Sequence, residues 1–357
     1  EVQQEFFKLG CSFNVFNSEN QTWVSLTGLN ENFEKATRLF ESLFSDPKVE
    51  EETLKNLVSD ILKKRSDAKQ EKRTILQKMM VNYAKFGAFN PATNLLTEDE
   101  LNKLQPAQIA ALIKSLMTYQ HKILYYGPKL IGDIKESLNT IHTVPVNGLK
   151  PVPAEANFVA QTFNNTVYVV DYDMKQAEIV ILTEGEKYDT KNIPLITMYN
   201  EYFGGGMSSV VFQDLRESKA LAYSCYSTYR KPANPKLPYY NFSYIASQAD
   251  KLPEAMAGMM NLLNAVPKSE IAFGAAREAI LQGIKTQRIN KADILFDYLN
   301  AEKFELKTDV RKDVYSAVTT MTYDDVKKFQ DEKIKNKPST ILILGKKDTL
   351  DIKTLEK

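Results

Sequence analysis

The segment Tyr202–Tyr229, YFGGGMSSVVFQDLRESKALAYSCYSTY, carries the strongest structural pattern in this sequence. Three consecutive glycines, Gly204–Gly206, follow a helix-like stretch, and glycine allows backbone conformations and close approaches that other residues disfavour. The next stretch, SSVVFQDLRESKA, is typical of a helix, and AYSCYSTYR is typical of a strand. The segment therefore predicts two helices, separated by a tight glycine loop, and then a strand.

Two side chains of this segment can take part in chemistry. Arg216 offers a permanent charge on a planar donor fork, and Tyr223 offers a hydroxyl donor that can stabilise a developing oxyanion. Taken alone, Arg216 is also explained by a surface ion pair with Asp214 or Glu217. The glycines are also explained by a tight corner between helices, and a phosphate loop is disfavoured because the Walker lysine and the GxGxxG spacing are absent.

The composition excludes several classes of protein. The chain has 357 residues, 43% of them hydrophobic, and its 46 Lys and Arg balance 45 Asp and Glu. This balance argues against a strongly basic nucleic-acid-binding protein. No run of 18 or more residues is continuously apolar, so no transmembrane helix is expected. The length is that of about two domains.

Cysteine and histidine are scarce. Cys11 and Cys225 form no CxxC pattern, and with His121 and His142 they offer no recognisable zinc-ligand spacing. We expect no metal site in this chain. The two cysteines can pair on arithmetic alone, but a free buried thiol is the commoner state. Each histidine is interpreted as a local structural residue.

The organisation along the chain points to an internal repeat. FEKATRLFESLF corresponds to LPEAMAGMMNLL, and ILYYGPK, expected to be a strand, corresponds to ILILGKK. We expect a first α+β domain over residues 1–145, an extended linker over 146–165 and a second α+β domain over 166–357. The predicted fold class is α+β, with two tandem copies of one unit, each an antiparallel sheet with helices packed on one face.

The run FGGGMSSVVFQDLRESKALAYSCYS resembles a signature of the pitrilysin/insulinase-type zinc metallopeptidases, the inverzincins. Val211 departs from the pattern, which usually has Leu there. The resemblance extends to SLTGLNENFEKATRLFESLF and VYVVDYDMKQAEIVI, and so covers nearly the whole chain. The matching residues are Gly204–Gly206, Ser208, Ser209, Phe212, Leu215, Arg216, Glu217, Leu221, Ala222, Tyr223 and Ser224.

The resemblance implies a non-zinc, C-terminal half of such a peptidase. The family's His-x-x-Glu-His motif is absent here, and zinc is expected in an N-terminal half that this sequence lacks. That half would be the partner, in the same polypeptide or as a separate subunit, and the first domain would be truncated at its start. The chain alone is then expected to be inactive. The likeness favours a bacterial periplasmic or membrane-associated location.

The same resemblance assigns roles to residues. Arg216 and Tyr223 match the positions that reach across the chamber to the carbonyl of a peptide substrate. Gly204, Gly205 and Gly206 are expected at the substrate-binding surface. Exposed sheet edges can add a peptide strand, and the aromatic residues between Tyr226 and Tyr244 line the chamber or pack the sheet.

Two other functions stay open at this point. One is a catalytically inactive scaffold or partner subunit of the same fold, and the other is an α+β module that binds a small ligand at the glycine loop. The first is disfavoured because a scaffold has no chemical need for both Arg216 and Tyr223.

Overall fold

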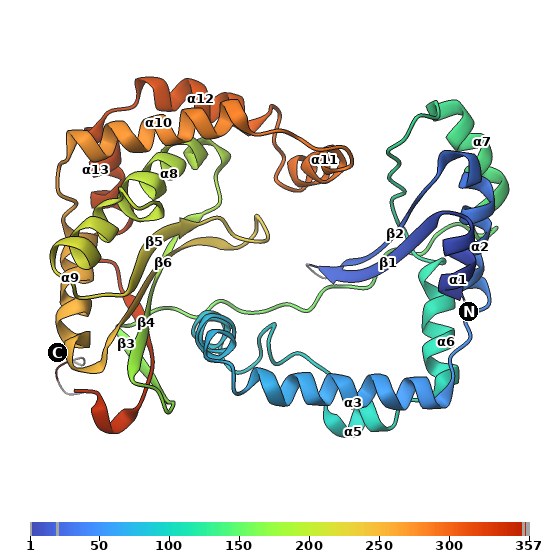
Figure 1. Ribbon diagram of the computed structural model, residues 1–357, viewed down its shortest axis with the longest axis horizontal. Coiled ribbons are helices and arrows are strands. Elements are labelled where there is room, and N and C mark those ends of the chain that lie inside the picture. Colours follow the sequence, from blue (N-terminus) through green and yellow to red (C-terminus); the bar gives the residue numbers. More distant parts are fainter. Residues whose placement is uncertain (1, 19–20, 352–353, 355–357) are drawn as a thin grey trace. The chain divides into compact units, whose positions relative to one another are not determined.

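The computed structural model describes residues 2–18, 21–351 and 354, and it divides the chain into two compact units (Figure 1). Unit 1 comprises Glu1–Asp67 and Leu95–Asn157, and unit 2 comprises Ala68–Asn94 and Phe158–Lys357. This division differs from the contiguous domains that the sequence predicts. The segment Ala68–Asn94 lies in the first half of the sequence but folds into the second unit.

Unit 1 is built from a hairpin and helices. The hairpin joins β1 (Cys11–Ser18) and β2 (Gln21–Gly28) in antiparallel register, and its predicted turn lies partly outside the described residues. Gly10 ends the first helix with a φ of +60°, as expected of a glycine C-cap. The helices are α1 (Val2–Lys8), α2 (Phe33–Ser45), α3 (Glu51–Ala68), α5 (Glu98–Asn102), α6 (Pro106–Leu116) and α7 (Ile131–Ile141).

The prediction of a strand in ILYYGPK, residues 123–129, is wrong, because none of these residues is in a strand. Its counterpart in the repeat, ILILG, is β7 (Ser339–Gly345), which hydrogen-bonds to strands on both sides. A strand needs such partners for its backbone groups. Among the described residues of unit 1, no equivalent pair of strands is present to receive ILYYGPK.

Unit 2 contains a five-stranded sheet with the order β3-β7-β4-β6-β5. All pairings are antiparallel except that of β3 with β7, which is parallel. The α+β class is confirmed, with one parallel pair added to the predicted antiparallel sheet. The remaining strands are β3 (Thr166–Asp171), β4 (Gln176–Lys187), β5 (Ser224–Arg230) and β6 (Pro238–Gln248).

One face of this sheet packs against most of the helices of unit 2 (Figure 1). Ile179 and Ile181 of β4 face that layer and are fully buried. The helix α11 (Asp293–Lys303) has no fully buried residue. The other helices are α8 (Ile193–Asn200), α9 (Leu252–Asn264), α10 (Glu270–Thr286), α12 (Val310–Thr320) and α13 (Tyr323–Lys333).

The other face of the sheet is covered by the segment Ala68–Asn94. This segment contains a π-helical stretch, η2 (Thr74–Met80), and α4 (Val81–Phe86). Leu76 is fully buried in one cluster with Val180 and Leu182, which alternate with the isoleucines on the first face of β4. The continuous apolar run of β4 is therefore explained by burial on both faces.

Polar contacts fix the same segment to the sheet. Lys72 Nζ lies 2.8 Å from Glu178 Oε1, a carboxylate that is almost fully buried on β4. The hydroxyl of Tyr172 donates to the carbonyl oxygen of Gln70 at 2.6 Å. The segment is thus bound by both apolar and polar contacts, which accounts for its membership of unit 2.

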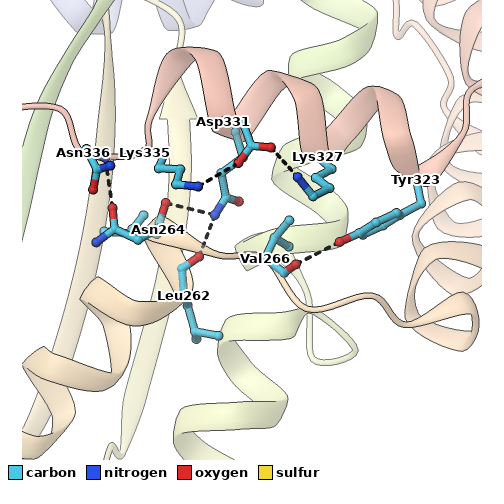
Figure 2. Close-up of polar contacts among 10 residues, drawn as sticks. Leu262, Asn264, Val266, Tyr323, Lys327, Asp331, Lys335 and Asn336 are labelled. Carbon is cyan, nitrogen blue, oxygen red and sulfur yellow. Dashed lines mark hydrogen bonds and ion pairs between the residues drawn. The ribbon is translucent and has the colours of Figure 1, made fainter.

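The end of α9 is held by α13, as Figure 2 shows. The buried Gln330 donates from Nε2 to the carbonyl oxygens of Leu262 at 2.6 Å and Leu263 at 2.9 Å. The Tyr323 hydroxyl donates to the Val266 carbonyl at 2.9 Å. The last carbonyls of a helix lack partners inside the helix, so Gln330 satisfies two of them, and Tyr323 holds the chain just beyond the end of α9.

We expect Leu76→Ala to destabilise unit 2 by about 2–5 kcal/mol, because it opens a cavity in a fully buried cluster. The measurement is urea unfolding followed by circular dichroism. Leu57→Ala is the matched control, since Leu57 lies on α3 in unit 1 and is 53% exposed. Equal stability of the two variants would contradict the assignment of this segment to the core of unit 2.

Candidate functional site

The glycine run begins inside one π-helical segment, which includes Gly204 and Gly205, and a second π-helical segment follows the turn after Gly206. The first, η4 (Glu201–Gly205), continues α8, and the second, η5 (Phe212–Ser218), carries Arg216. The order of helix, loop, helix and strand follows the sequence prediction. π-Helical segments are rare and occur frequently at functional sites, so the segment that stands out in the sequence also stands out in backbone geometry.

Gly204 is the point at which helix and sheet come closest. A Cβ atom at Gly204 would lie 2.4 Å from both the backbone nitrogen and the backbone oxygen of Ser227 on β5. The side chain of Asn200 completes this contact: it accepts from the Tyr229 N–H at 2.7 Å and donates to the Tyr229 carbonyl at 3.1 Å. Helix α8 and its π-helical extension therefore cover the outer edge of β5.

This contact affects two expectations from the sequence: that a peptide strand adds to an exposed sheet edge, and that the glycines lie at the substrate-binding surface. The edge of β5 is already occupied at Ser227 and Tyr229, so a peptide cannot add there as a further strand. Gly204 itself is buried where η4 meets β5, and packing alone explains the glycine there. Its predicted place at the substrate-binding surface stays a prediction. Gly205 is exposed and Gly206 is half-buried, so these two remain accessible from solvent.

Hydrogen bonds within the loop make it a preformed turn. The Ser209 N–H donates to the Gly206 carbonyl at 3.0 Å, and Gln213 Nε2 donates to the Met207 carbonyl at 2.7 Å. Met207, at the tip, is 76% exposed. The loop thus presents one apolar side chain to solvent on a fixed backbone.

Arg216 lies on the exposed side of η5. Its guanidinium carbon stands 4.7 Å from the centroid of the Phe212 ring, and its Nε lies 3.8 Å from a Glu217 carboxylate oxygen. Of the two ion pairs that the sequence offered, the one with Glu217 is present and the one with Asp214 is not seen among the described residues, where Asp214 pairs with Lys219 at 2.6 Å. Arg216 is therefore held by ring stacking and a long ion pair, which leaves donor groups of its guanidinium free for a ligand.

Tyr223 lies at the entrance to β5. Its backbone N–H donates to the Ala246 carbonyl at 2.8 Å, and its hydroxyl accepts a hydrogen bond from Gln248 Nε2 at 2.9 Å. The side chain is 53% exposed. Because Gln248 uses an acceptor position of the oxygen, the phenolic proton stays available to donate. No hydrogen bond joins Tyr223 to Arg216 in the described part of the chain.

Arg216 and Asp214 both influence the pKa of the Cys225 thiol at the start of β5. Burial raises the pKa of the Cys225 thiol to about 11, Arg216 acts in the opposite direction, and Asp214 adds to the rise. The Leu221 N–H donates to the Leu215 carbonyl at 2.9 Å and the Cys225 thiol donates to the Val211 carbonyl at 3.6 Å, so the segment that carries Arg216 packs against the start of β5, next to Tyr223. Cys225 and Cys11 are both free thiols, so the disulfide that the sequence left open is not formed.

Two cations lie on the second face of the sheet. Lys85 Nζ is 4.1 Å from the centroid of the Tyr240 ring, and the Arg230 guanidinium carbon is 3.5 Å from that of Phe242. Burial, together with the positive charge of the nearby Arg230, lowers the pKa of Lys85 to about 8. Burial likewise lowers the pKa of Arg230, which Tyr226 partly offsets. These cations rest on aromatic rings.

The aromatic residues of β5 and β6 divide between the two faces. Tyr229 and Tyr239 are buried in the main core, whereas Tyr240, Phe242 and Tyr244 are buried against Ala68–Asn94. Tyr226 packs against this second cluster and is partly exposed. The packing interpretation of the aromatic run therefore holds for most of its members.

The residues that the structure describes do not fit a catalytic zinc site. The described residues contain no group of three or more histidine, cysteine or acidic side chains that could hold a metal ion. The structure does bring His121 and His142 together, at 2.9 Å between their Nε2 atoms. No pattern in the sequence predicts this contact, because the two residues are 21 apart and belong to no common helix or strand.

Two models of one family match this chain. The model described as Insulinase (Peptidase family M16) matches residues 1–94, and the model described as the Peptidase M16 inactive domain matches residues 129–272. The chain belongs to peptidase family M16. The resemblance stated from the sequence is thereby confirmed, and the candidate residues Arg216 and Tyr223 lie in the part that matches the inactive domain.

Known relatives of this M16 chain include an uncharacterised zinc protease, YmxG, of Bacillus subtilis. It is 25% identical over 236 residues, which are 64% of this chain and 54% of the relative, so the chain spans about half the length of this curated relative. None of the helices in the described ranges has the length and apolar content needed to cross a membrane.

Two solved structures share the fold. The M16 inactive domain from Pseudomonas fluorescens has a TM-score of 0.72 at 15% identity, covering 96% of this chain and 82% of that one. The periplasmic protease PqqL from Escherichia coli has a TM-score of 0.66 at 14% identity, covering 97% of this chain and 38% of that one.

We expect Gly204→Ala to destabilise the M16 chain by at least about 1–3 kcal/mol, because the new methyl group would collide with the backbone of β5. Gly206→Ala is the control, since its nearest neighbour is the movable end of the Glu201 side chain at 3.0 Å. Chemical unfolding of both variants measures the difference. Tolerance of Gly204→Ala at the level of the control would refute the close contact.

Lys85→Met tests the buried cation. The folded-state pKa of Lys85 is lowered to about 8 from its ordinary value of 10.5. Below pH 8, Lys85 is charged in the folded and in the unfolded chain, and the full cost of removing its charge from water opposes folding. Between pH 8 and 10.5, Lys85 is neutral in the folded chain but still charged in the unfolded chain, so this cost falls as the pH rises. The stability of Lys85→Met relative to the wild type should therefore be greatest below pH 8 and decline toward pH 10.5.

Unfolding free energies at pH 7, 9 and 10 measure this trend. The exposed Lys312→Met serves as the control and should show no such trend. A pH-independent difference between Lys85→Met and the wild type would argue against the lowered pKa.

Proposed function

We propose that this chain is the C-terminal, non-metal-binding half of an M16 zinc metallopeptidase, and that it contributes Arg216 and Tyr223 to binding the carbonyl of a peptide substrate. The observation that carries the proposal is the placement of Tyr223. Its hydroxyl is exposed and oriented by Gln248, and it keeps a proton to donate. Gly205 and Gly206 lie on the accessible side of the preceding loop and line the same substrate path.

Tyr223 would donate its phenolic hydrogen bond to the carbonyl oxygen as negative charge develops there. Such donors are effective when they are fixed before the reaction begins. The backbone bond to Ala246 and the side-chain bond from Gln248 fix this one. Arg216, which carries a permanent charge, would hold the substrate backbone or orient Tyr223.

The partner would be an N-terminal, zinc-binding half, in the same polypeptide or as a separate subunit. Zinc is expected there, as the description of the relative from Bacillus subtilis as a zinc protease suggests. This chain, which offers no cluster of three metal ligands among its described residues, would be inactive alone. Peptides are the proposed substrates, and the near-neutral net charge of +1 supports no nucleic-acid role.

A location in the bacterial cell envelope is part of the proposal. The structural neighbour PqqL is described as a periplasmic protease. Such a location permits either an exported or a membrane-associated parent protein.

A second candidate is a catalytically inactive scaffold or partner subunit. The match to a domain described as inactive favours it. The two candidates differ in whether Arg216 and Tyr223 affect turnover.

In the complete protein, we expect Tyr223→Phe and Arg216→Ala each to lower kcat for peptide cleavage by about 10²-fold, the effect of losing one oxyanion donor. Tyr223→Phe removes a single oxygen atom and preserves the ring. A loss in kcat rather than a rise in KM would indicate action in the transition state. Zinc content and thermal unfolding are measured alongside.

Two variants elsewhere on the surface serve as controls for the chemical change itself. Tyr298→Phe and Arg288→Ala alter exposed residues of the same types, and they should leave cleavage unchanged. Unchanged turnover in both Tyr223→Phe and Arg216→Ala would eliminate the catalytic role and favour the scaffold.

A further inference from the structure

The second face of the unit 2 sheet carries two cations close together. Lys85 of α4 has its Nζ 4.1 Å from the centroid of the Tyr240 ring. Tyr240 of β6 is the direct cross-strand partner of Arg230, the last residue of β5. The Arg230 guanidinium carbon stands 3.5 Å from the centroid of the Phe242 ring, which lies on the same face. Both cationic side chains are half-buried, so a ligand can still reach them from solvent.

These two charges repel each other and have no anion to compensate them. The positive charge of Arg230 helps to lower the pKa of Lys85 to about 8. Neither cation forms an ion pair with a carboxylate in the part of the chain that the structure describes. Glu184 of β4, the other cross-strand neighbour of Tyr240, is not their counter-ion, because burial raises the pKa of its carboxyl and no cation opposes that rise.

Bringing two like charges together in a half-buried place opposes folding, and an anion between them would remove that cost. We propose that Lys85 and Arg230 together bind one oxyanion, a carboxylate or a sulfate- or phosphate-type group, on the β5 side of this face. The planar guanidinium offers paired donors that match two oxygens of such a group, and the ammonium adds a compact charge.

Hydroxyl groups beside the cations add further donors. Arg230 hydrogen-bonds to the hydroxyl of Tyr226 on the same face of β5. Because a guanidinium only donates, the Tyr226 oxygen accepts this bond and its phenolic proton stays available for a ligand. Thr228 lies between these two residues on the same face, and its side chain is half-buried. An oxyanion would therefore meet N–H and O–H donors here.

The other charges on this face also favour an anion. Arg73, exposed on the segment Ala68–Asn94, acts to lower the pKa of the buried Tyr244 and so lies near the same aromatic residues. Glu178 is already paired with a lysine at 2.8 Å. Among the described residues of this part of the face, the positive charges therefore outnumber the unpaired carboxyl of Glu184.

Two sources supply such a group: a free inorganic ion, and the acidic side chain of a bound peptide. The peptide source rests on the proposed function, since it would make this pair a subsite that favours acidic residues in the substrate. The anion site itself does not depend on that function. The test therefore uses one probe for each source and measures binding rather than cleavage.

Binding to the 357-residue chain is measured by calorimetry at constant ionic strength, with chloride as the balancing ion. Sulfate is the inorganic probe, because its charge does not change between pH 7 and pH 9. An end-blocked tetrapeptide of glutamate is the carboxylate probe, and the glutamine tetrapeptide is its uncharged control. We expect one site per chain at pH 7. Tighter binding of sulfate would identify a free ion as the ligand, and tighter binding of the glutamate peptide would identify an acidic peptide.

Substitutions of the two cations locate the site. Lys85→Met and Arg230→Met should each weaken binding by about tenfold or more, the effect of losing a hydrogen bond to a charged group. Lys312→Met makes the same change at an exposed lysine and should bind as the wild type does. Thermal unfolding of each variant checks that it is folded. Because sulfate stabilises proteins in general, binding and not the shift in Tm is compared.

The charge of Lys85 provides a second readout. Sulfate binding to the wild type should weaken from pH 7 to pH 9, because Lys85 loses its proton over this range. Lys85→Arg keeps its charge at both pH values and should bind equally at both.

The proposal is overturned if neither sulfate nor the glutamate peptide binds the wild-type chain at millimolar concentration. It is equally overturned if a probe binds Lys85→Met and Arg230→Met as tightly as the wild type, because the anion would then be held elsewhere. Neither result depends on whether Arg216 and Tyr223 act in catalysis, so failure of this proposal leaves the proposed function to its own test.

Discussion

The contact between Gly204 and the backbone of β5 is the constraint on which the candidate site depends. Because Gly204 has no side chain, the helix can lie directly along the strand, and Asn200 pairs with the strand one turn earlier. This fixes the end of the first helix, and the loop that follows has to turn sharply away. The next segment then returns to the β5 entrance with Arg216 exposed on it.

Within this short motif, some residues are buried and serve packing, and others are exposed and available for chemistry. Gly204, Leu215 and Cys225 are buried and hold the helices and strand together. Arg216 and Tyr223 are exposed at the same corner, and each has contacts that orient it without using all of its donors. A motif of this kind can be preserved in a scaffold for its packing alone. Only the exposed pair distinguishes an active partner from an inert one, which is why the functional proposal rests on it.

The sheet of unit 2 is covered on both faces by segments from distant parts of the chain. The second face receives Ala68–Asn94, and Glu178 on β4 pairs with Lys72 from that segment. Burying a carboxylate is costly unless it is paired, so this ion pair makes the arrangement specific. The half-buried cation Lys85 lies on the same face, above an aromatic ring, which partly compensates its desolvation.

The sequence by itself determined the local elements, the family and the residues of the candidate site. Helical periodicity, the glycine run and the alternation in β5 are local patterns, and local patterns are readable because they follow from the 3.6- and 2-residue repeats of helix and strand. It predicted Arg216 on a helix and Tyr223 at the start of a strand, and the structure has Arg216 on η5 and Tyr223 directly before β5. Their role in chemistry stays a prediction.

Tertiary structure alone decided which segments meet. In the tertiary structure, Ala68–Asn94 belongs to the second unit and β3 pairs with β7 in parallel. ILYYGPK forms no strand, and His121 lies next to His142. Each of these depends on contacts between residues far apart in the chain. Such contacts are selected by burial and by pairing of polar groups over the whole fold, and no periodicity in a single segment encodes them.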